Sequence, residues 1–273
     1  MSAATPTRLV QLTHPEEGRR AALVYGNRLH LLASYRSVYS FAMAALDTGW
    51  KLRDALSTDL SGIDLDYGEV YDLATPWRFL PAFDHPEEPS RCLVSAAGPP
   101  WQYLGSGDSL RAHGDPVPHA GRGDLAVVYV IGRNATPRRV GMALGQTGIQ
   151  NASRHSVLGP ELALDIDLAR VESTAKVFRA GSEVWSQSFS GGDTPLAWAL
   201  ASVEPDYFEA AGARRFGDAH VHFFGERIFG ATGGIPAVEL DELVIEVTGL
   251  GRPLHNCLRS ELSADLRVAA IPL

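Results

Sequence analysis

The sequence has few of the residues that form disulfide frameworks or common cofactor sites. Its two cysteines, Cys92 and Cys257, form no Cys-x-x-Cys pair and are too few for a disulfide framework. Lysine occurs only at Lys51 and Lys176, which leaves two candidates for Schiff-base chemistry. No Gly-x-Ser-x-Gly elbow, Walker loop or dinucleotide fingerprint is present. The sequence therefore does not indicate a serine hydrolase of that type or a nucleotide-binding enzyme.

Long apolar runs and an excess of positive charge are also missing. No stretch approaches the roughly 18 apolar residues of a membrane helix, and residues 1–8 lack the features of a signal peptide. We therefore expect a cytoplasmic protein that does not bind membranes. The net charge of -8 repels phosphate backbones, which argues against a nucleic-acid partner.

The chain of 273 residues has an ordinary globular composition, with 45% hydrophobic residues. Residues 1–85 are predicted to form a small α/β domain. Its apolar runs, the hairpin turn Gly26-Asn27 and a helix from Ser37 to Gly49 support this prediction. The predicted strands cover residues 9–12, 22–25 and 29–32. Residues 81–90 have the proline-rich, acidic composition of a linker, and the predicted boundary falls there.

Residues 86–273 are predicted to form a second domain that is rich in strands. Residues 125–131 are continuously apolar, as in a strand that is buried on both faces. Further strands are predicted at residues 139–144, 174–179, 183–189, 219–224 and 242–248. Thr194-Pro195 predicts a helix over 196–203, and Glu204-Pro205 predicts the start of another. The predicted fold class is therefore β-rich α+β.

Two clusters of polar residues are candidates for a site. His220 and His222 alternate along a predicted strand and share one of its faces. They could line a pocket or hold a metal, but a metal needs a third ligand and only Asp218 is near in sequence; a structural pair is the alternative. Residues 103–124 are rich in glycine, proline, histidine and aspartate, which predicts a loop. A His–Asp pair there could move protons, or the loop could be a solvated connector.

Six phrases, in this order, resemble the fumarylacetoacetate hydrolase superfamily, and most closely its sugar-acid (AraD1-like) branch. The phrases are Arg91-Cys-Leu-Val-Ser95, Val128-Tyr-Val-Ile-Gly132, Arg139-Val-Gly-Met-Ala-Leu-Gly145, Gly159-Pro-Glu-Leu162, Gly217-Asp-Ala-His-Val-His-Phe-Phe-Gly225 and Gly251-Arg-Pro-Leu254. The resemblance implies a β-roll, a homodimer and chemistry on 2-oxo acids or 1,3-dicarbonyls. It also implies Mg²⁺, which family members bind through a Glu-x-Glu pair before the Val-Tyr-Val-Ile strand and a later aspartate.

The sequence departs from the family at these ligand positions. The Glu-x-Glu pair is replaced by Arg122-Gly-Asp124, and the acid expected after Gly145 is missing from Gln146-Thr-Gly-Ile-Gln150. The helix with a lysine that normally follows is also missing. A guanidinium repels a divalent cation but can hold a carboxylate with two parallel hydrogen bonds. We therefore predict that the protein binds no metal and needs no cofactor.

The leading hypothesis is a metal-independent lyase, isomerase or cyclase that acts on a small oxo- or enol-bearing substrate, with specialised metabolism as its setting. The predicted catalytic residues are Arg122, Asp124 and His119, and the predicted substrate-binding residues are Tyr103, Gln150, His220 and His222. One alternative is a Mg²⁺-dependent C–C hydrolase or 2-keto-3-deoxy sugar-acid dehydratase. Another is a small-molecule-binding protein that kept the fold without the chemistry.

Overall fold

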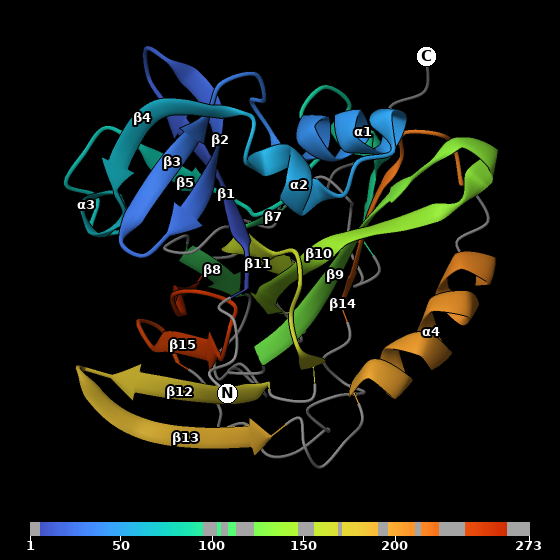
Figure 1. The fold of residues 1–273 in the computed structure, drawn as a ribbon. Helices are drawn as coiled ribbons and strands as arrows, with labels where there is room; N and C mark the ends of the chain where they lie inside the picture. The colour runs from blue at the N-terminus through green and yellow to red at the C-terminus, as the bar shows by residue number, and fades with distance from the viewer. Residues whose placement is uncertain are drawn as a thin grey trace, which may run out of the picture.

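The computed structural model describes residues 6–94, 103–104, 109–112, 123–146, 156–168, 171–190, 196–210, 214–223 and 238–260. These residues form two β-sheets and four α-helices (Figure 1). None of the helices in these ranges is long and apolar enough to cross a membrane.

The larger sheet contains eleven strands in the order β4-β3-β2-β1-β11-β10-β9-β14-β6, with β5 paired to β1 and β7 paired to β11. Its strands are β1 (Arg8–His14), β2 (Gly18–Tyr25), β3 (Arg28–Leu32), β4 (Leu60–Asp66), β5 (Arg78–Leu80), β6 (Cys92–Val94), β7 (Tyr103–Leu104), β9 (Gly123–Ile131), β10 (Pro137–Gln146), β11 (Ser156–Ala163) and β14 (Ala219–Phe223). The smaller sheet has the order β13-β12-β15-β16-β8. Its strands are β8 (Ser109–Ala112), β12 (Glu172–Arg179), β13 (Ser182–Ser190), β15 (Glu242–Val247) and β16 (Leu254–Ser260).

The first helix forms where the sequence predicts it. The helices are α1 (Val38–Thr48), α2 (Leu52–Leu56), α3 (Tyr67–Tyr71) and α4 (Leu196–Ala210), with 3-10 turns at Pro89–Arg91 and Arg133–Ala135. Ser37 caps α1 by accepting from the backbone N–H of Ser40, whose hydroxyl accepts from Ser37 N–H in return. Gly49 ends the helix in the left-handed conformation, at φ 74°.

The last helix differs from the prediction. The expected break at Glu204-Pro205 is wrong, because α4 continues through Pro205 as a single helix. Proline has no N–H, so the carbonyl of Ala201 loses its partner within the helix. Ala201 and Pro205 both lie on the exposed side of α4, where water can bond that carbonyl. The continuous helix places Glu204 and Tyr207 one turn apart.

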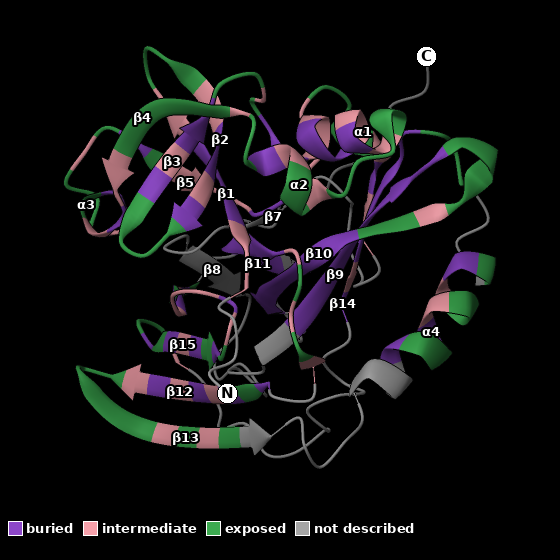
Figure 2. Ribbon diagram, viewed as in Figure 1, coloured by how far each residue is buried: buried purple, intermediate pink, exposed green. Residues whose placement is uncertain are grey.

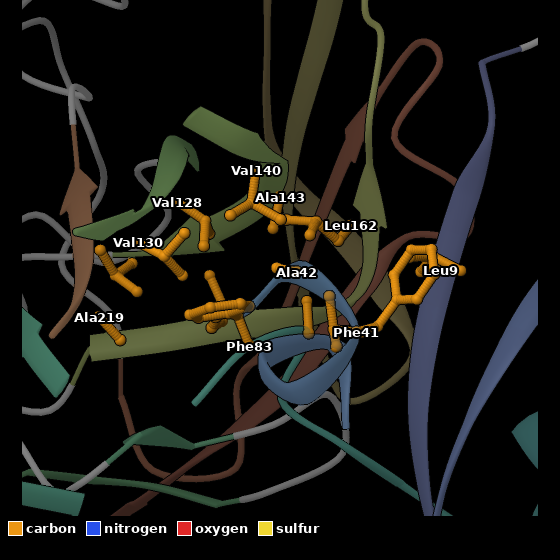
Figure 3. Packing of buried hydrophobic residues seen from close by; sticks show 14 of the residues in the cluster. Leu9, Phe41, Ala42, Phe83, Val128, Val130, Val140, Ala143, Leu162 and Ala219 are labelled. Atoms are coloured by element: carbon orange, nitrogen blue, oxygen red, sulfur yellow. The ribbon is translucent and has the colours of Figure 1, made fainter. Parts of the chain in front are cut away.

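Strand β9 separates two apolar cores, as its uninterrupted apolar sequence predicts. Ala126, Val128 and Val130 pack against α1, in a cluster that we call the α1 core (Figure 3). Leu125, Val127, Tyr129 and Ile131 point to the other face. There they pack with residues of the smaller sheet and of α4, in a cluster that we call the inter-sheet core. The burial colours in Figure 2 show that β9 is buried along most of its length. A third cluster lies among the first strands, α3 and β5.

The sheet is continuous across the predicted domain boundary at residues 85 and 86. Strand β1 pairs with β11, so that Leu9 lies opposite Leu162. Phe83, before the boundary, packs in the α1 core together with Val128. The division into two domains remains a prediction of the sequence, and the described strands on both sides of it share one sheet and one core.

Two of the phrases that carry the family resemblance meet in the structure. The buried carboxylate of Glu161, in Gly159-Pro-Glu-Leu162, accepts hydrogen bonds from Arg8 at 2.6 Å, from the Tyr67 hydroxyl and from the backbone N–H of Arg252 at 2.8 Å. Gly251 adopts a φ of 92°, and a Cβ there would overlap the Glu161 carboxylate. Glycine at 251 therefore lets the Gly251-Arg-Pro-Leu254 segment approach β11.

Candidate functional site

Several neighbouring strands of the larger sheet begin or end at the same level, and we refer to this row of strand ends as one edge of the sheet. Asp124 near the start of β9 lies opposite Gly145 near the end of β10, and Gln146 lies opposite Val157 of β11. Tyr103 of β7 pairs in register with Ser156 at the start of β11. Strand β14 also ends here. We call the backbone positions at this edge the strand-end cluster; they are Tyr103, Asp124, Gln146, Ser156 and Phe223.

The strand-end cluster contains two of the residues that the sequence singled out, Tyr103 and Asp124, at the level of the backbone. Arg122, His119 and Gln150 lie outside the described residues, and so do the side chains of Tyr103 and Asp124. The loop predicted over residues 103–124 is wrong in three places, because β9 already begins at Gly123, and Tyr103–Leu104 and Ser109–Ala112 are short strands. They pair with β11 and β16, partners that are distant in sequence, and local composition does not encode such pairs.

The two histidines of β14 lie on one face of the strand, as alternation predicts. Ala219, Val221 and Phe223 pack in the α1 core, whereas His220 and His222 both contact Tyr207 of α4. His220 is fully buried, and His222 is half-buried. The Nδ1 atom of His220 lies 3.0 Å from the Tyr207 hydroxyl.

Burial determines the protonation of this pair. Desolvation lowers the pKa of His220 to about 4, and the opposing effect of the Asp218 carboxylate is smaller. Burial also raises the pKa of the Tyr207 hydroxyl above its ordinary value. At neutral pH the two groups are therefore a neutral imidazole and a neutral phenol.

Asp218, the nearest carboxylate in sequence, serves another purpose. It accepts a hydrogen bond from Arg91 Nε at 2.9 Å and one from the backbone N–H of Arg215 at 3.1 Å. These bonds hold the chain immediately before β14 against the turn before β6. Among the described residues, no group of three His, Cys, Asp or Glu side chains could hold a metal ion.

Mg²⁺ prefers carboxylate oxygens, and among the five positions of the strand-end cluster only Asp124 has a carboxylate, which is a poor donor set for this ion. Of the carboxylates that the family resemblance implies before β9, only Asp124 remains, next to the cationic Arg122 in sequence. Gln146 ends β10 opposite Gly123 and is 2% exposed, so a neutral amide is buried at this edge. We derive no step of the chemistry through a metal ion.

Three buried polar atoms of the inter-sheet core have no hydrogen-bond partner among the described residues. They are Oε1 of Gln146, Oγ of Ser173 and Nε2 of His220. Gln146 follows Met142 and Leu144 on the inter-sheet face of β10, and Ser173 precedes Ala175 and Val177 on β12. Buried polar atoms are rarely left unpaired, and a ligand is one way to satisfy them.

The sequence reasoning missed Gln146, Ser173 and Tyr207. Gln146 carried a usable signal, since a polar residue directly follows the apolar strand Arg139-Val-Gly-Met-Ala-Leu-Gly145. Ser173 and Tyr207 carried none, because a serine in an alternating strand and a tyrosine in a helix are ordinary.

No protein-family profile and no curated protein matches this sequence. Solved structures match it over nearly its whole length. A 2-keto-3-deoxyarabinonate dehydratase superposes with a TM-score of 0.64 and 11% identity over 94% of this chain and 100% of that chain. A 2-keto-3-deoxy-D-arabinonate dehydratase complexed with magnesium and 2,5-dioxopentanoate has a TM-score of 0.65 and 12% identity, over 93% of this chain and 99% of that chain. A 5-carboxymethyl-2-hydroxymuconate delta-isomerase from Mycobacterium smegmatis has a TM-score of 0.54 and 16% identity, over 93% of this chain and 100% of that chain.

These neighbours are members of the fumarylacetoacetate hydrolase superfamily. At such low identity the likeness shows the fold. The chain therefore has the strand-rich fumarylacetoacetate-hydrolase-like fold, which confirms the predicted fold class.

Proposed function

We propose that the protein is a metal-independent enzyme that acts on a small oxo- or enol-bearing substrate at the strand-end cluster. The observation that carries this proposal is the meeting of five strand ends at an edge where a buried amide and an Arg-Gly-Asp sequence stand in place of clustered carboxylates. The fold supports an enzyme acting on oxo acids, since its neighbours include a dehydratase and isomerases of such compounds.

In this proposal Arg122 holds the carboxylate or enolate of the substrate with its planar guanidinium. Asp124 or His119 removes and returns a proton beside the oxo group, as lyase and isomerase reactions of oxo acids require. Tyr103, Gln150, His220 and His222 line the pocket. The protein is further proposed to be a cytoplasmic homodimer. Light scattering checks the dimer, and a mass of 29.4 kDa at micromolar concentration would refute it.

A second candidate is a Mg²⁺-dependent 2-keto-3-deoxy sugar-acid dehydratase. It is favoured by one observation, the close match in length and fold to a dehydratase complexed with magnesium and 2,5-dioxopentanoate. Incubation of the purified protein with 2-keto-3-deoxy-D-arabinonate and with 5-carboxymethyl-2-hydroxymuconate, with EDTA or with Mg²⁺, separates the two. The proposal expects turnover of an oxo acid that EDTA does not reduce. Turnover that appears only with Mg²⁺ supports the second candidate.

Substitution of Arg122 tests the proposed charge. A charge-assisted hydrogen bond contributes roughly 1.5–3 kcal/mol, or about one to two orders of magnitude in rate. We expect Arg122→Ala to lower kcat/KM by that factor and Arg122→Lys to restore little, because lysine lacks the planar fork. Arg133→Ala is the matched control, since the exposed Arg133 lies just beyond the opposite end of β9, where it pairs with Asp47 at 3.3 Å and lies over the Phe216 ring. An Arg122→Ala enzyme with full activity would remove this residue from the mechanism.

A further inference from the structure

Tyr207 lies where α4 covers the histidine face of β14. Its hydroxyl oxygen is 3.0 Å from Nδ1 of His220, and its ring stands edge-on to His222 with the ring centroids 4.2 Å apart. The next residue, Phe208, packs against His220 with centroids 5.4 Å apart and against Tyr129 at 5.0 Å. One turn of α4 therefore contacts both histidines.

An ion pair to β10 and a hydrogen bond to β9 tie this turn of α4 to the larger sheet. Glu204 stands three residues before Tyr207 and so lies on the same side of the helix. Its carboxylate accepts hydrogen bonds from the Tyr129 hydroxyl at 2.7 Å and from Arg139 Nη2 at 2.6 Å. Tyr129 lies directly opposite His220 in the sheet register. The Tyr207 hydroxyl is thereby held at a fixed place relative to the His220 ring.

The number of partners decides which way the Tyr207–His220 hydrogen bond runs. Both groups are neutral, so one imidazole nitrogen carries a proton and the other accepts one. If the hydroxyl donates to Nδ1, one buried atom, the protonated Nε2, lacks a partner among the described residues. If Nδ1 donates to the hydroxyl oxygen instead, two groups lack a partner among the described residues: the unprotonated Nε2 and the hydroxyl proton of Tyr207. Burial favours the arrangement with fewer unpaired groups, in which Tyr207 donates and Nε2 carries the proton.

We infer that Tyr207 is a positioning residue, whose hydroxyl holds His220 as an Nε2–H donor for the oxo or enolate oxygen of the substrate. The identity of that oxygen rests on the proposed function. A neutral donor that is fixed in a buried place stabilises negative charge as it develops on an oxygen, without reorganisation. His220 lies on β14 three residues before Phe223, which is one of the positions of the strand-end cluster.

His85 shows that an unpaired nitrogen alone does not mark a substrate contact. Its Nε2 also has no partner among the described residues, and its Nδ1 accepts from the backbone N–H of Glu88 at 3.0 Å. His85 stacks on Tyr39 of α1, on the side of the larger sheet that faces the α1 core, and the backbone N–H of Glu88 fixes its tautomer. It therefore serves as an internal control for His220.

The test measures the tautomer directly, by NMR of the histidine side-chain nitrogens in ¹⁵N-labelled protein. We expect His220 of the wild type to carry its proton on Nε2 and Tyr207→Phe to give a mixture of tautomers, with the His85 signals unmoved in both. Tyr39→Phe is the matched control, because the Tyr39 hydroxyl donates to the Gly217 carbonyl at 2.7 Å and Tyr39 packs against the α1 core, whereas Tyr207 packs against the inter-sheet core. Oxalate, a planar mimic of an oxo-acid enolate, should shift Nε2 of His220 and leave His85 unchanged.

Activity supplies a second readout. Tyr207→Phe should lower kcat on the oxo acid that the enzyme turns over by about tenfold, with KM changed less than about twofold, because the group acts on developing charge. The inference is overturned if wild-type His220 carries its proton on Nδ1, if Tyr207→Phe leaves the tautomer unchanged, or if oxalate leaves the His220 signals unmoved. If no oxo acid is turned over, the proposed function fails, while the nitrogen signals still decide the role of Tyr207.

Discussion

Two buried glutamines, one on each side of the larger sheet, have opposite surroundings. Gln11 of β1 is fully buried, and its amide donates to the Pro81 carbonyl at 2.7 Å and to Asp84 at 2.9 Å. Its oxygen accepts from the backbone N–H of Val38, the first residue of α1, at 2.9 Å. Gln146 of β10 is buried as well, yet its Oε1 has no partner among the described residues.

This contrast indicates that buried polar groups serve two different roles in the molecule, one in stability and one in binding. Gln11 joins β1, the predicted linker and α1, so its hydrogen bonds stabilise the fold on the side of the α1 core. Gln146 lies on the other side, at the strand-end cluster, and its Oε1 has no partner in the part of the chain that the structure describes. Stability should therefore depend mainly on the α1 side, and binding should depend on the inter-sheet side.

The largest effect on stability should come from the α1 core. Phe41 is fully buried there, and Phe41→Ala removes its contacts and leaves a cavity (Figure 3). We expect the free energy of unfolding to fall by about 3–5 kcal/mol, as measured by chemical denaturation. The His220 nitrogen signals should stay as in the wild type below the unfolding transition. A Phe41→Ala protein with altered His220 signals would contradict the separation of the two sides.

Acid should destabilise the inter-sheet side through His220. Its pKa is lowered to about 4 in the folded protein, so the unfolded chain, with an ordinary histidine, binds more protons below pH 6.5. The stability that depends on a neutral ring is complete above pH 6.5 and is lost as the pH falls towards 4. We expect a loss of about 3 kcal/mol between pH 7 and pH 4 from this group.

Comparison with His220→Phe isolates the contribution of His220 to the pH dependence of stability, because other groups titrate too. Burial also lowers the pKa of His85, and the Arg179 partner of Asp241 lowers the pKa of that carboxyl; both contributions remain in the variant. The difference in unfolding free energy between the two proteins should therefore change with pH between 6.5 and 4. A constant difference would mean that the pKa of His220 is the same in the folded and unfolded states.

Local features of the sequence predicted much of the fold. The Ser37 cap, the turn between β2 and β3 and the doubly buried β9 depend on neighbours within a few residues, and all appear in the structure. The shared face of His220 and His222 follows from alternation alone. The resemblance to a known family supplied the rest of the architecture.

The contacts of the candidate site depend on pairs that are distant in sequence. Glu161 meets Arg8 across 153 residues, and the strand-end cluster depends on the register of β9, β10, β11 and β7. No local pattern encodes such pairs, so Tyr207 could not be singled out from the sequence, and the only signal for Gln146 was its polar side chain directly after an apolar strand. The Pro205 position shows the same limit, because the exposed side of α4 tolerates a proline that local rules place at a helix start.

Removal of the Gln11 amide should have a moderate effect on stability. Gln11→Met keeps the length of the side chain and loses all three hydrogen bonds. Each bond contributes about 1 kcal/mol, so we expect the free energy of unfolding to fall by about 2–3 kcal/mol. Denaturation by urea measures it, and activity on an oxo acid should be unchanged at temperatures where the variant is folded. Loss of activity without loss of stability would contradict the structural role of Gln11.

The smallest effect on stability should come from the same substitution at Gln146. Methionine fills the space of glutamine and removes an Oε1 atom that has no described partner, so Gln146→Met should change the free energy of unfolding by less than about 1 kcal/mol. Binding should respond in the opposite way, because that oxygen is buried at the strand-end cluster and has no partner among the described residues. We expect calorimetric titration with oxalate to show affinity at least about fivefold weaker in Gln146→Met, and unchanged affinity in Gln11→Met. A Gln146→Met protein that loses as much stability as Gln11→Met, with unchanged oxalate affinity, would show that both glutamines serve the fold. The contrast between the two sides of the sheet would then be lost.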